Sequence, residues 1–189
     1  IEKVLFLPAQ VAPHKLGKTV TDPIHRYAML ALATQDEPKL AVSTFEIEVA
    51  NRRYTVDTLD HFLRTAGDTS DLFFIMGADS WVEITTWRDW RRLLTMVNLI
   101  VVTRPGYELI GPAEVSDRIV DLRSNGKQVV PYEHGQKIYL TDVVMKDVSA
   151  TQIRSVASKG RYDELAMLLS PPVVEYIEKY GICQESNED

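Results

Sequence analysis

An apolar run that stops at a glycine constrains the fold of this chain more than any other feature. Phe73-Phe74-Ile75-Met76 is followed by Gly77 and, two places later, by Asp79. Such a run predicts a buried strand that ends in a tight turn, with a carboxylate just beyond it. In open α/β sheets, ligands bind in the crevice outside the carboxyl ends of the strands, so Asp79 is a candidate site residue. The alternative is that Asp79 only caps a helix.

A second segment has the composition of an anion-binding helix start. Ser149 and Thr151 stand where a helix is predicted to begin, and Arg154 lies within its first turns. The free N–H groups and the dipole of a helix start favour a phosphate, and the planar guanidinium of Arg154 suits the same anion. The alternatives are a plain N-cap for the hydroxyl residues and a surface position for Arg154.

Apolar runs and helical patterns alternate along the rest of the chain. We predict strands over Glu2–Pro8, Ala41–Val49, Phe73–Gly77, Asn98 to the Pro105-Gly106 stop, and Lys137–Thr141. We predict helices over Pro23–Thr34, from Tyr54, from Asp89, over Glu114–Leu122, after Ser149, after Tyr162 and from Pro171. This alternation with apolar strands predicts an α/β fold, a parallel sheet covered by helices on both faces.

The composition indicates a globular domain with an ordinary core. The chain has 189 residues, of which 45% are apolar and 25% charged, and we expect one domain over residues 1–183 with a frayed acidic tail over 184–189. The net charge of −6 argues against a general nucleic-acid binder. The single Cys183 excludes an internal disulfide and a cysteine metal cage. No apolar run has the length of a membrane span and no signal-peptide pattern is present, so a cytoplasmic location is expected.

Taken in order, these segments resemble bacterial nicotinate mononucleotide adenylyltransferases of the nucleotidyltransferase superfamily. The matching pieces are Val4–Pro8 with Pro13-His14-Lys15, His25–Leu30, Tyr54–Leu59, Gly77-Ala78-Asp79 with Trp87, Arg104-Pro105-Gly106, Val148–Arg154, and Val174–Ile177 with Tyr180-Gly181. The resemblance implies a doubly wound, Rossmann-like parallel sheet of the nucleotidyltransferase type. It also implies adenylyl transfer from ATP to nicotinate mononucleotide, with Mg²⁺ accompanying ATP and pyrophosphate as the second product.

The resemblance assigns residues to two sides of a site. The ATP side would comprise Ser149, Thr151, Ile153, Arg154, Gly77 and Asp79. The nicotinate mononucleotide side would comprise Thr55, Trp87, Lys15, His14 and Arg104. Composition alone cannot choose Trp87 over its neighbours Trp81 and Trp90. For Thr55, the alternative to a binding role is a helix cap. For Pro13-His14-Lys15, the alternative to a phosphate-binding loop is a solvated turn. No residue is assigned to a metal. Neither nucleic acid nor a membrane is expected as a partner, and a homodimer is a possible assembly.

The family's His-x-Gly-His motif has no counterpart from Ile1 onward. We expect its strand and Gly-rich turn to precede Ile1, because a parallel sheet without its inner first strand would expose apolar edges and backbone groups. The alternative is a genuine fragment. The segment that precedes that motif in the family is similar to Thr21-Asp22-Pro23-Ile24-His25. However, Tyr27 and Ala28 stand where the Gly and the second His of the motif would be. We therefore assign no catalytic residue within the chain and no catalytic role to His25.

Two other functions compete with this interpretation. One is another small-molecule nucleotidyltransferase, such as one acting on phosphopantetheine, although Thr55 and Trp87 favour a pyridine nucleotide. The other is a truncated, non-catalytic nucleotide-binding protein. Comparing the binding of the two acceptors would distinguish a phosphopantetheine enzyme from a nicotinate mononucleotide enzyme. The residues before Ile1 would show whether the protein is a truncated, non-catalytic one.

Overall fold

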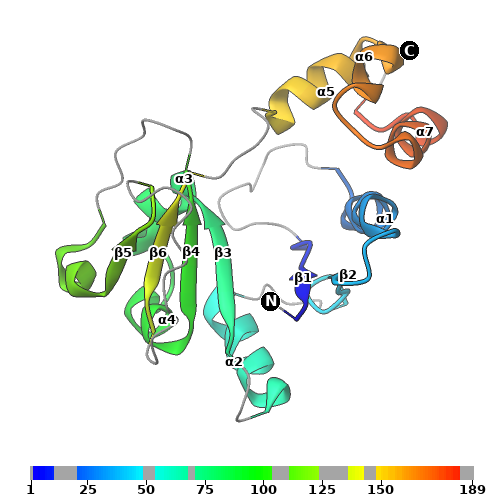
Figure 1. The fold of residues 1–189 in the computed structure, drawn as a ribbon. Coiled ribbons are helices and arrows are strands. Elements are labelled where there is room, and N and C mark those ends of the chain that lie inside the picture. The colour runs from blue at the N-terminus through cyan, green and yellow to red at the C-terminus, as the bar shows by residue number, and fades with distance from the viewer. Residues whose placement is uncertain are drawn as a thin grey trace. The chain divides into compact units, whose positions relative to one another are not determined.

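The chain divides into two compact units, each with its own sheet and its own core (Figure 1). The computed structural model describes residues 2–10, 21–48, 54–67, 71–103, 111–123, 136–142 and 148–183. Unit 1 combines Ile1–Arg52 with Asp147–Asp189, and unit 2 is Arg53–Lys146. The expectation of a single domain over 1–183 stays a prediction, and the 184–189 tail lies outside the described residues.

Four parallel strands form the sheet in the described part of unit 2. They are β3 (Phe73–Gly77), β4 (Asn98–Val102), β5 (Ile119–Asp121) and β6 (Ile138–Thr141), in the order β3-β4-β6-β5. The register aligns Met76 with Val101, and Val101 with Leu140. Because alternate residues of a strand point to the same face, these runs direct a continuous apolar row to one side of the sheet.

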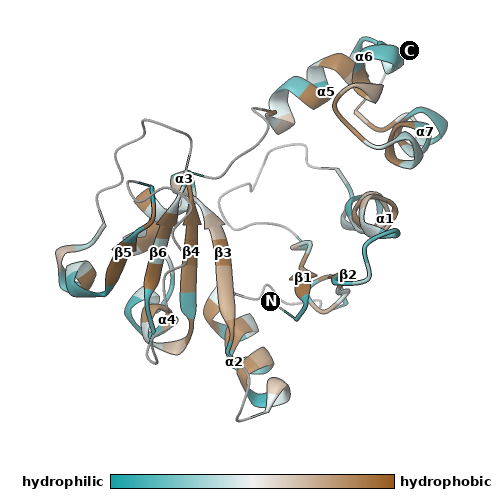
Figure 2. Ribbon diagram, in the orientation of Figure 1, coloured by the Kyte–Doolittle hydropathy of each residue, from teal (hydrophilic) through white to brown (hydrophobic). Residues whose placement is uncertain are grey.

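That row is the centre of the unit 2 core. The helical segments of the unit are α2 (Thr55–Ala66), α3 (Ala78–Val82), the 3₁₀ turn η2 (Ile84–Thr86), α4 (Trp90–Met96) and the 3₁₀ turn η3 (Ala113–Arg118). The buried core residues are Leu59, Met76, Trp81, Ile84, Leu93, Leu94, Val97, Leu99, Val101, Val115, Ile138 and Leu140. Figure 2 shows the strands as the most consistently apolar elements of the unit.

The opposite face of the sheet is also apolar but less buried. The register places Ile75, Ile100, Tyr139 and Val120 in one row across all four strands. Ile75 is 48% exposed, and the other three are partly buried. The two faces therefore differ in packing, and the core cluster of unit 2 lies on the first.

Unit 1 has a two-stranded parallel sheet and a helical core. Strand β1 (Val4–Phe6) pairs with β2 (Leu40–Val42). The helices are α1 (Pro23–Thr34), α5 (Ala150–Ser158), α6 (Tyr162–Ala166) and α7 (Pro171–Tyr180). The buried cluster consists of Val156, Ala157, Leu165, Val173, Val174, Ile177 and Ile182, with Met29 and Leu32 of α1 packed against it. Helix α7 stops at Gly181, whose φ of 60° is the left-handed conformation that glycine adopts without strain.

Two predicted elements are wrong. The predicted strand Ala41–Val49 ends at Val42, and the Ile47 and Glu48 N–H groups turn back to donate to the Thr44 carbonyl. The predicted helix Glu114–Leu122 is a 3₁₀ turn followed by β5. In the second case the pairing of Ile119–Asp121 with β6 overrides the local helical pattern, because strand pairing also satisfies the backbone of that segment.

The other elements follow the predictions closely. Helix α1 spans the predicted residues, and β3, β4, β6, α5 and α7 lie where their patterns indicated. The α/β class, with parallel strands flanked by helices, is confirmed. Within the described residues, none of the helices combines the length and the apolar character needed to cross a membrane.

Candidate functional site

The carboxyl end of β3 passes directly into a short helix that presents Asp79. Gly77 is the N-cap of α3 with a φ of −78°, and its own side-chain position is open, with no atom within 4 Å. Asp79 is exposed in the first turn of α3, and none of the described residues holds its carboxylate by a hydrogen bond or an ion pair. Asp79 is therefore not the N-cap, and its carboxylate and the space beside Gly77 lie together at the strand end.

The start of helix α2 carries the predicted acceptor residue Thr55. Tyr54 is the N-cap, and its N–H donates to the Asp57 carboxylate at 3.4 Å. Asp57 therefore contributes to the cap, and Thr55 is the first helical residue rather than the cap. Thr55 is partly buried at this helix start.

Trp87 lies against the core, at the end of η2. Its ring meets Phe74 edge-on, with 6.3 Å between the ring centroids, and it is partly buried. Phe74 is the second residue of β3, so this contact joins the Trp87 segment to that strand. Trp81 is buried, and Trp90 packs partly buried against the same core.

The residue after Trp87 joins two of the predicted segments. The Arg88 guanidinium carbon lies 4.6 Å from the centroid of the Tyr54 ring. This contact brings the Trp87 segment to the start of α2, where Thr55 is the next residue. Arg88 was not among the site residues predicted from the sequence. Its position directly after Trp87 was the only sequence feature that linked it to them.

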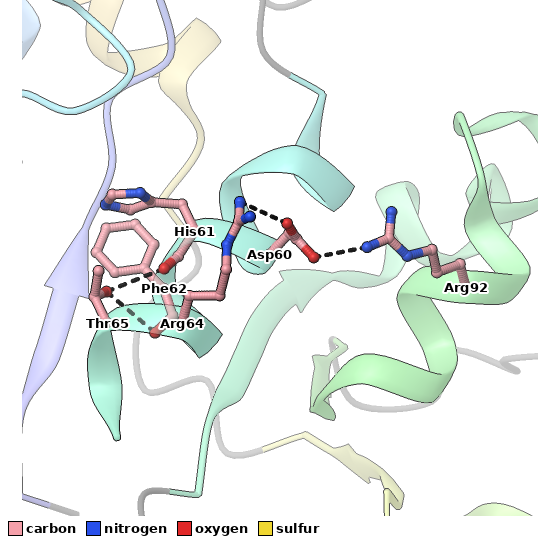
Figure 3. Close-up of polar contacts among 6 residues, drawn as sticks. All are labelled: Asp60, His61, Phe62, Arg64, Thr65 and Arg92. Atoms are coloured by element: carbon pink, nitrogen blue, oxygen red, sulfur yellow. Dashed lines mark hydrogen bonds and ion pairs between the residues drawn. The ribbon is translucent and has the colours of Figure 1, made fainter. Parts of the chain in front are cut away.

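Helix α2 is also tied to helix α4 by a shared carboxylate. Asp60 accepts from Arg64 at 2.7 Å and from Arg92 at 2.6 Å (Figure 3). These pairs are largely exposed and contribute little free energy each, but they join the two helices through charged groups outside the apolar core. Asp89, which caps α4, has a left-handed φ of 49°.

The predicted start of helix α5 in unit 1 is formed. The Ser149 hydroxyl caps α5 by accepting from the Gln152 N–H at 3.1 Å. Thr151 and Arg154 are exposed, and the Arg154 guanidinium donates to the Thr151 hydroxyl at 3.4 Å. Ile153 turns inward and packs against the unit 1 core. Ser149 therefore caps α5, and the Thr151 hydroxyl and the Arg154 guanidinium lie next to each other on the exposed side of the helix.

Three predicted site residues and His25, to which no role was assigned, remain. Lys15, His14 and Arg104 lie outside the described residues. His25 is described, and its Nδ1 lies 2.9 Å from the Tyr176 hydroxyl while its ring packs against Tyr176 and Tyr180. These contacts join α1 to α7, which gives His25 a structural explanation.

No group of three or more His, Cys, Asp or Glu side chains suited to a metal ion occurs among the described residues.

Parallel strands with a carboxylate at a strand end, and a capped hydroxyl-rich helix start, are features typical of α/β proteins that bind nucleotides. A family model described as cytidylyltransferase-like matches residues 1–156, and the chain belongs to this family.

The chain is also similar to individual proteins of known description. The chain is 36% identical over 189 residues to a probable nicotinate-nucleotide adenylyltransferase of Thermoanaerobacter sp., covering 100% of this chain and 83% of the relative. A probable nicotinate-nucleotide adenylyltransferase of Desulfitobacterium hafniense is 37% identical over 182 residues, covering 96% of this chain and 81% of the relative.

The fold has solved counterparts. A Plasmodium falciparum nicotinic acid mononucleotide adenylyltransferase complexed with NaAD matches with a TM-score of 0.68 and 15% identity, covering 97% of this chain and 83% of that one. The same protein complexed with APC matches with a TM-score of 0.67. At this identity the likeness demonstrates a shared fold, and it confirms the nucleotidyltransferase type of the sheet.

Proposed function

We propose that this protein is an enzyme that transfers the adenylyl group of ATP to nicotinate mononucleotide. The observation that carries the proposal is the similarity to nicotinate-nucleotide adenylyltransferases along the whole chain, at 36% identity over 189 residues. The products are nicotinate adenine dinucleotide and pyrophosphate, a step of NAD biosynthesis.

The reaction asks the protein mainly for alignment and charge compensation. A phosphate oxygen of nicotinate mononucleotide attacks the α-phosphorus of ATP, a new P–O bond forms, and the bond to the leaving pyrophosphate breaks. No side chain needs to form a covalent bond. The protein must hold the two phosphates in line and stabilise the negative charge that develops on the leaving group.

For ATP, contact residues are proposed in each unit separately, at the start of α5 in unit 1 and at the end of β3 in unit 2. Ser149 and Thr151 offer hydroxyls and helix-start N–H groups to the phosphates, and Arg154 offers its planar fork. Ile153 packs beneath them and orients the helix. Gly77 leaves room for a close approach of the nucleotide, and the Asp79 carboxylate accepts from a ribose hydroxyl. Mg²⁺ arrives with ATP and would neutralise phosphate charge there.

On the acceptor side, the proposal uses Trp87 as a flat wall for the pyridine ring and Thr55 as a donor to its carboxylate. Lys15, His14 and Arg104 are proposed for the acceptor phosphate. The contact of Arg88 with Tyr54 supports this grouping, because it joins the Trp87 and Thr55 segments. The cytoplasmic location and the homodimer stay predictions.

The test is pyrophosphate release by the purified full-length polypeptide with ATP, Mg²⁺ and one acceptor at a time. We expect release with nicotinate mononucleotide and formation of nicotinate adenine dinucleotide in equal amount. Phosphopantetheine serves as the control acceptor. Release with phosphopantetheine but not with nicotinate mononucleotide would assign the protein to a different reaction of its family.

A further inference from the structure

Arg88 differs from the other described arginines of unit 2 in its partners. Arg91 donates to both oxygens of Glu114 at 2.8 and 2.7 Å, Arg64 and Arg92 bind Asp60, and Arg123 binds Asp121 at 2.6 Å. Arg118 donates to the main-chain carbonyls of Gln136 and Leu94.

In contrast, the one carboxylate recorded near Arg88 among the described residues is that of Asp89, whose oxygen lies 3.9 Å away. That separation is too long for a hydrogen bond. Within the described residues, the N–H donors of Arg88 are therefore not engaged by a carboxylate at hydrogen-bonding distance.

The Tyr54 ring nevertheless restrains the Arg88 side chain. The guanidinium carbon lies 4.6 Å from the ring centroid, and the Arg88 side chain remains 55% exposed. A guanidinium stacked on an aromatic ring engages through its face, whereas its N–H donors lie in its plane and point outward. Arg88 therefore contacts Tyr54 while its side chain remains exposed, and its N–H donors can pair with a planar anion, such as a carboxylate, that accepts two parallel hydrogen bonds.

The neighbours of this contact are the residues proposed for the acceptor. Arg88 follows Trp87 directly, and Tyr54 directly precedes Thr55. The Asp57 carboxylate, which accepts from the Tyr54 N–H at 3.4 Å, already places a negative charge at the same helix start. A second carboxylate would be repelled there unless a cation stood beside it, and Arg88 is the described cation in contact with Tyr54.

We propose that Arg88 is the specificity-determining residue that makes this enzyme prefer an acceptor with a carboxylate on its pyridine ring over one with a carboxamide. The inference rests on the proposed function, which it deepens. The guanidinium pairs with the ring carboxylate of nicotinate mononucleotide while the ring lies on Trp87. The uncharged carboxamide of nicotinamide mononucleotide offers one acceptor oxygen and no charge, so it gains much less from Arg88.

The acceptor has a second anionic group, its phosphate, and the experiment separates the two. Equilibrium binding to the full-length protein is measured by titration calorimetry with three ligands. Nicotinate mononucleotide has both anions, nicotinamide mononucleotide has only the phosphate, and nicotinate riboside has only the carboxylate. The variants are Arg88→Met, which keeps the length of the side chain, and Arg88→Lys, which keeps the charge.

The matched control is Arg64→Met. Arg64 lies on α2, is exposed, and forms an ordinary surface pair with Asp60, so its replacement removes the same charge from the same unit. We expect Arg88→Met to weaken nicotinate mononucleotide and nicotinate riboside on the order of tenfold to a hundredfold and to leave nicotinamide mononucleotide within about twofold. Arg88→Lys recovers part of the preference, and Arg64→Met retains all of it.

Three results would overturn the inference. Equal weakening of both mononucleotides by Arg88→Met, with nicotinate riboside unaffected, would assign Arg88 to the phosphate. Equal weakening of all three ligands together with a lowered melting temperature would make the Tyr54 contact purely structural. Unchanged discrimination would remove Arg88 from the site. A wild-type protein that binds none of the three pyridine ligands would refute the proposed function itself, which distinguishes that failure from the others.

Discussion

At the residue scale, the enclosure of Trp81 leaves no room for a side chain at position 111. A Cβ atom added to Gly111 would lie 2.7 Å from Cζ2 of Trp81 and 3.2 Å from Cδ1 of Ile119. Trp81 is 1% exposed, and its indole N–H is buried without a hydrogen-bond partner among the described residues. The tryptophan therefore stabilises α3 by packing alone, close to the turn that presents Asp79.

We expect Gly111→Ala to destabilise the protein by about 1–3 kcal/mol, because overpacking a closed core forces its neighbours to move. Urea unfolding measures the free energy of unfolding. Gly77→Ala is the matched control, since Gly77 has a negative φ and open space around it. In a Trp81→Phe background, the smaller ring should reduce the cost of Gly111→Ala. Equal costs in both backgrounds would place the strain elsewhere.

A second prediction at the residue scale concerns Arg154 and Trp87. Each of the two alanine variants serves as the control for the other. Arg154→Ala should weaken ATP binding by about 1.5–3 kcal/mol, because it removes charge-assisted hydrogen bonds to phosphate. Trp87→Ala should weaken nicotinate mononucleotide binding by about 1–2 kcal/mol through lost stacking. Because Trp87 also packs on the core, its replacement lowers stability as well.

The measurement is the dissociation constant of each ligand for each variant of the full-length protein, below the unfolding temperature. The two losses should be ligand-specific. If Arg154→Ala left ATP binding unchanged and lowered only the melting temperature, Arg154 would be an ordinary surface residue. If Trp87→Ala weakened both ligands equally, its role as an acceptor wall would have to be abandoned.

At the element scale, the 3₁₀ turn η3 is held to α4 by charged groups. Arg91 of α4 forms two hydrogen bonds with Glu114 of η3, and the guanidinium of Arg118 donates to the Leu94 carbonyl. The hydrogen bond and the charge of Arg91 hold the pKa of Glu114 below its ordinary value, although desolvation opposes the shift. A pKa lowered on folding stabilises the folded state above the unfolded-state pKa and is lost as the pH falls through the folded-state pKa.

We therefore predict that wild-type protein is slightly more stable than Glu114→Gln near neutral pH, and that this difference disappears on acidification. The loss should begin as the pH falls below about 4.5, the ordinary value for glutamate, and end below the lowered pKa of Glu114. Melting temperatures of both proteins between neutral and strongly acidic pH provide the measurement. Glu83→Gln, at an exposed position of the same unit, is the control. A constant difference at every pH would show that Glu114 acts without its charge.

Two helices show where the local sequence pattern was sufficient to predict an element and its ends. Helix α1 begins at Pro23 after the Asp22 cap, and the Asp22 carboxylate accepts from the Ile24 N–H at 2.7 Å. Helix α7 has proline in its first turn and Gly181 at its end. These signals act within a few residues of the chain, so the sequence predicts the element and its bounds together.

At the scale of the whole molecule, each unit carries its own proposed ligand-contacting residues on its own core. The described residues Thr55, Gly77, Asp79 and Trp87 belong to unit 2, and Ser149, Thr151, Ile153 and Arg154 belong to unit 1. The first group stands on a core centred on β3, β4 and β6, and the second on the core of α5, α6 and α7. The stability effect of a substitution in one core should therefore be compared with a control substitution in the same unit.

The sequence by itself determined the α/β class, most strands and helices, and the type of residue at each strand end and helix start. It could do so because apolar periodicity, caps and breakers are local properties. Only the tertiary structure decided the strand order β3-β4-β6-β5, the conversion of Ile119–Asp121 into a strand, and the stacking of Arg88 on Tyr54. Each of these joins residues far apart in the chain, so its free energy depends on a pairing or contact that no single segment contains.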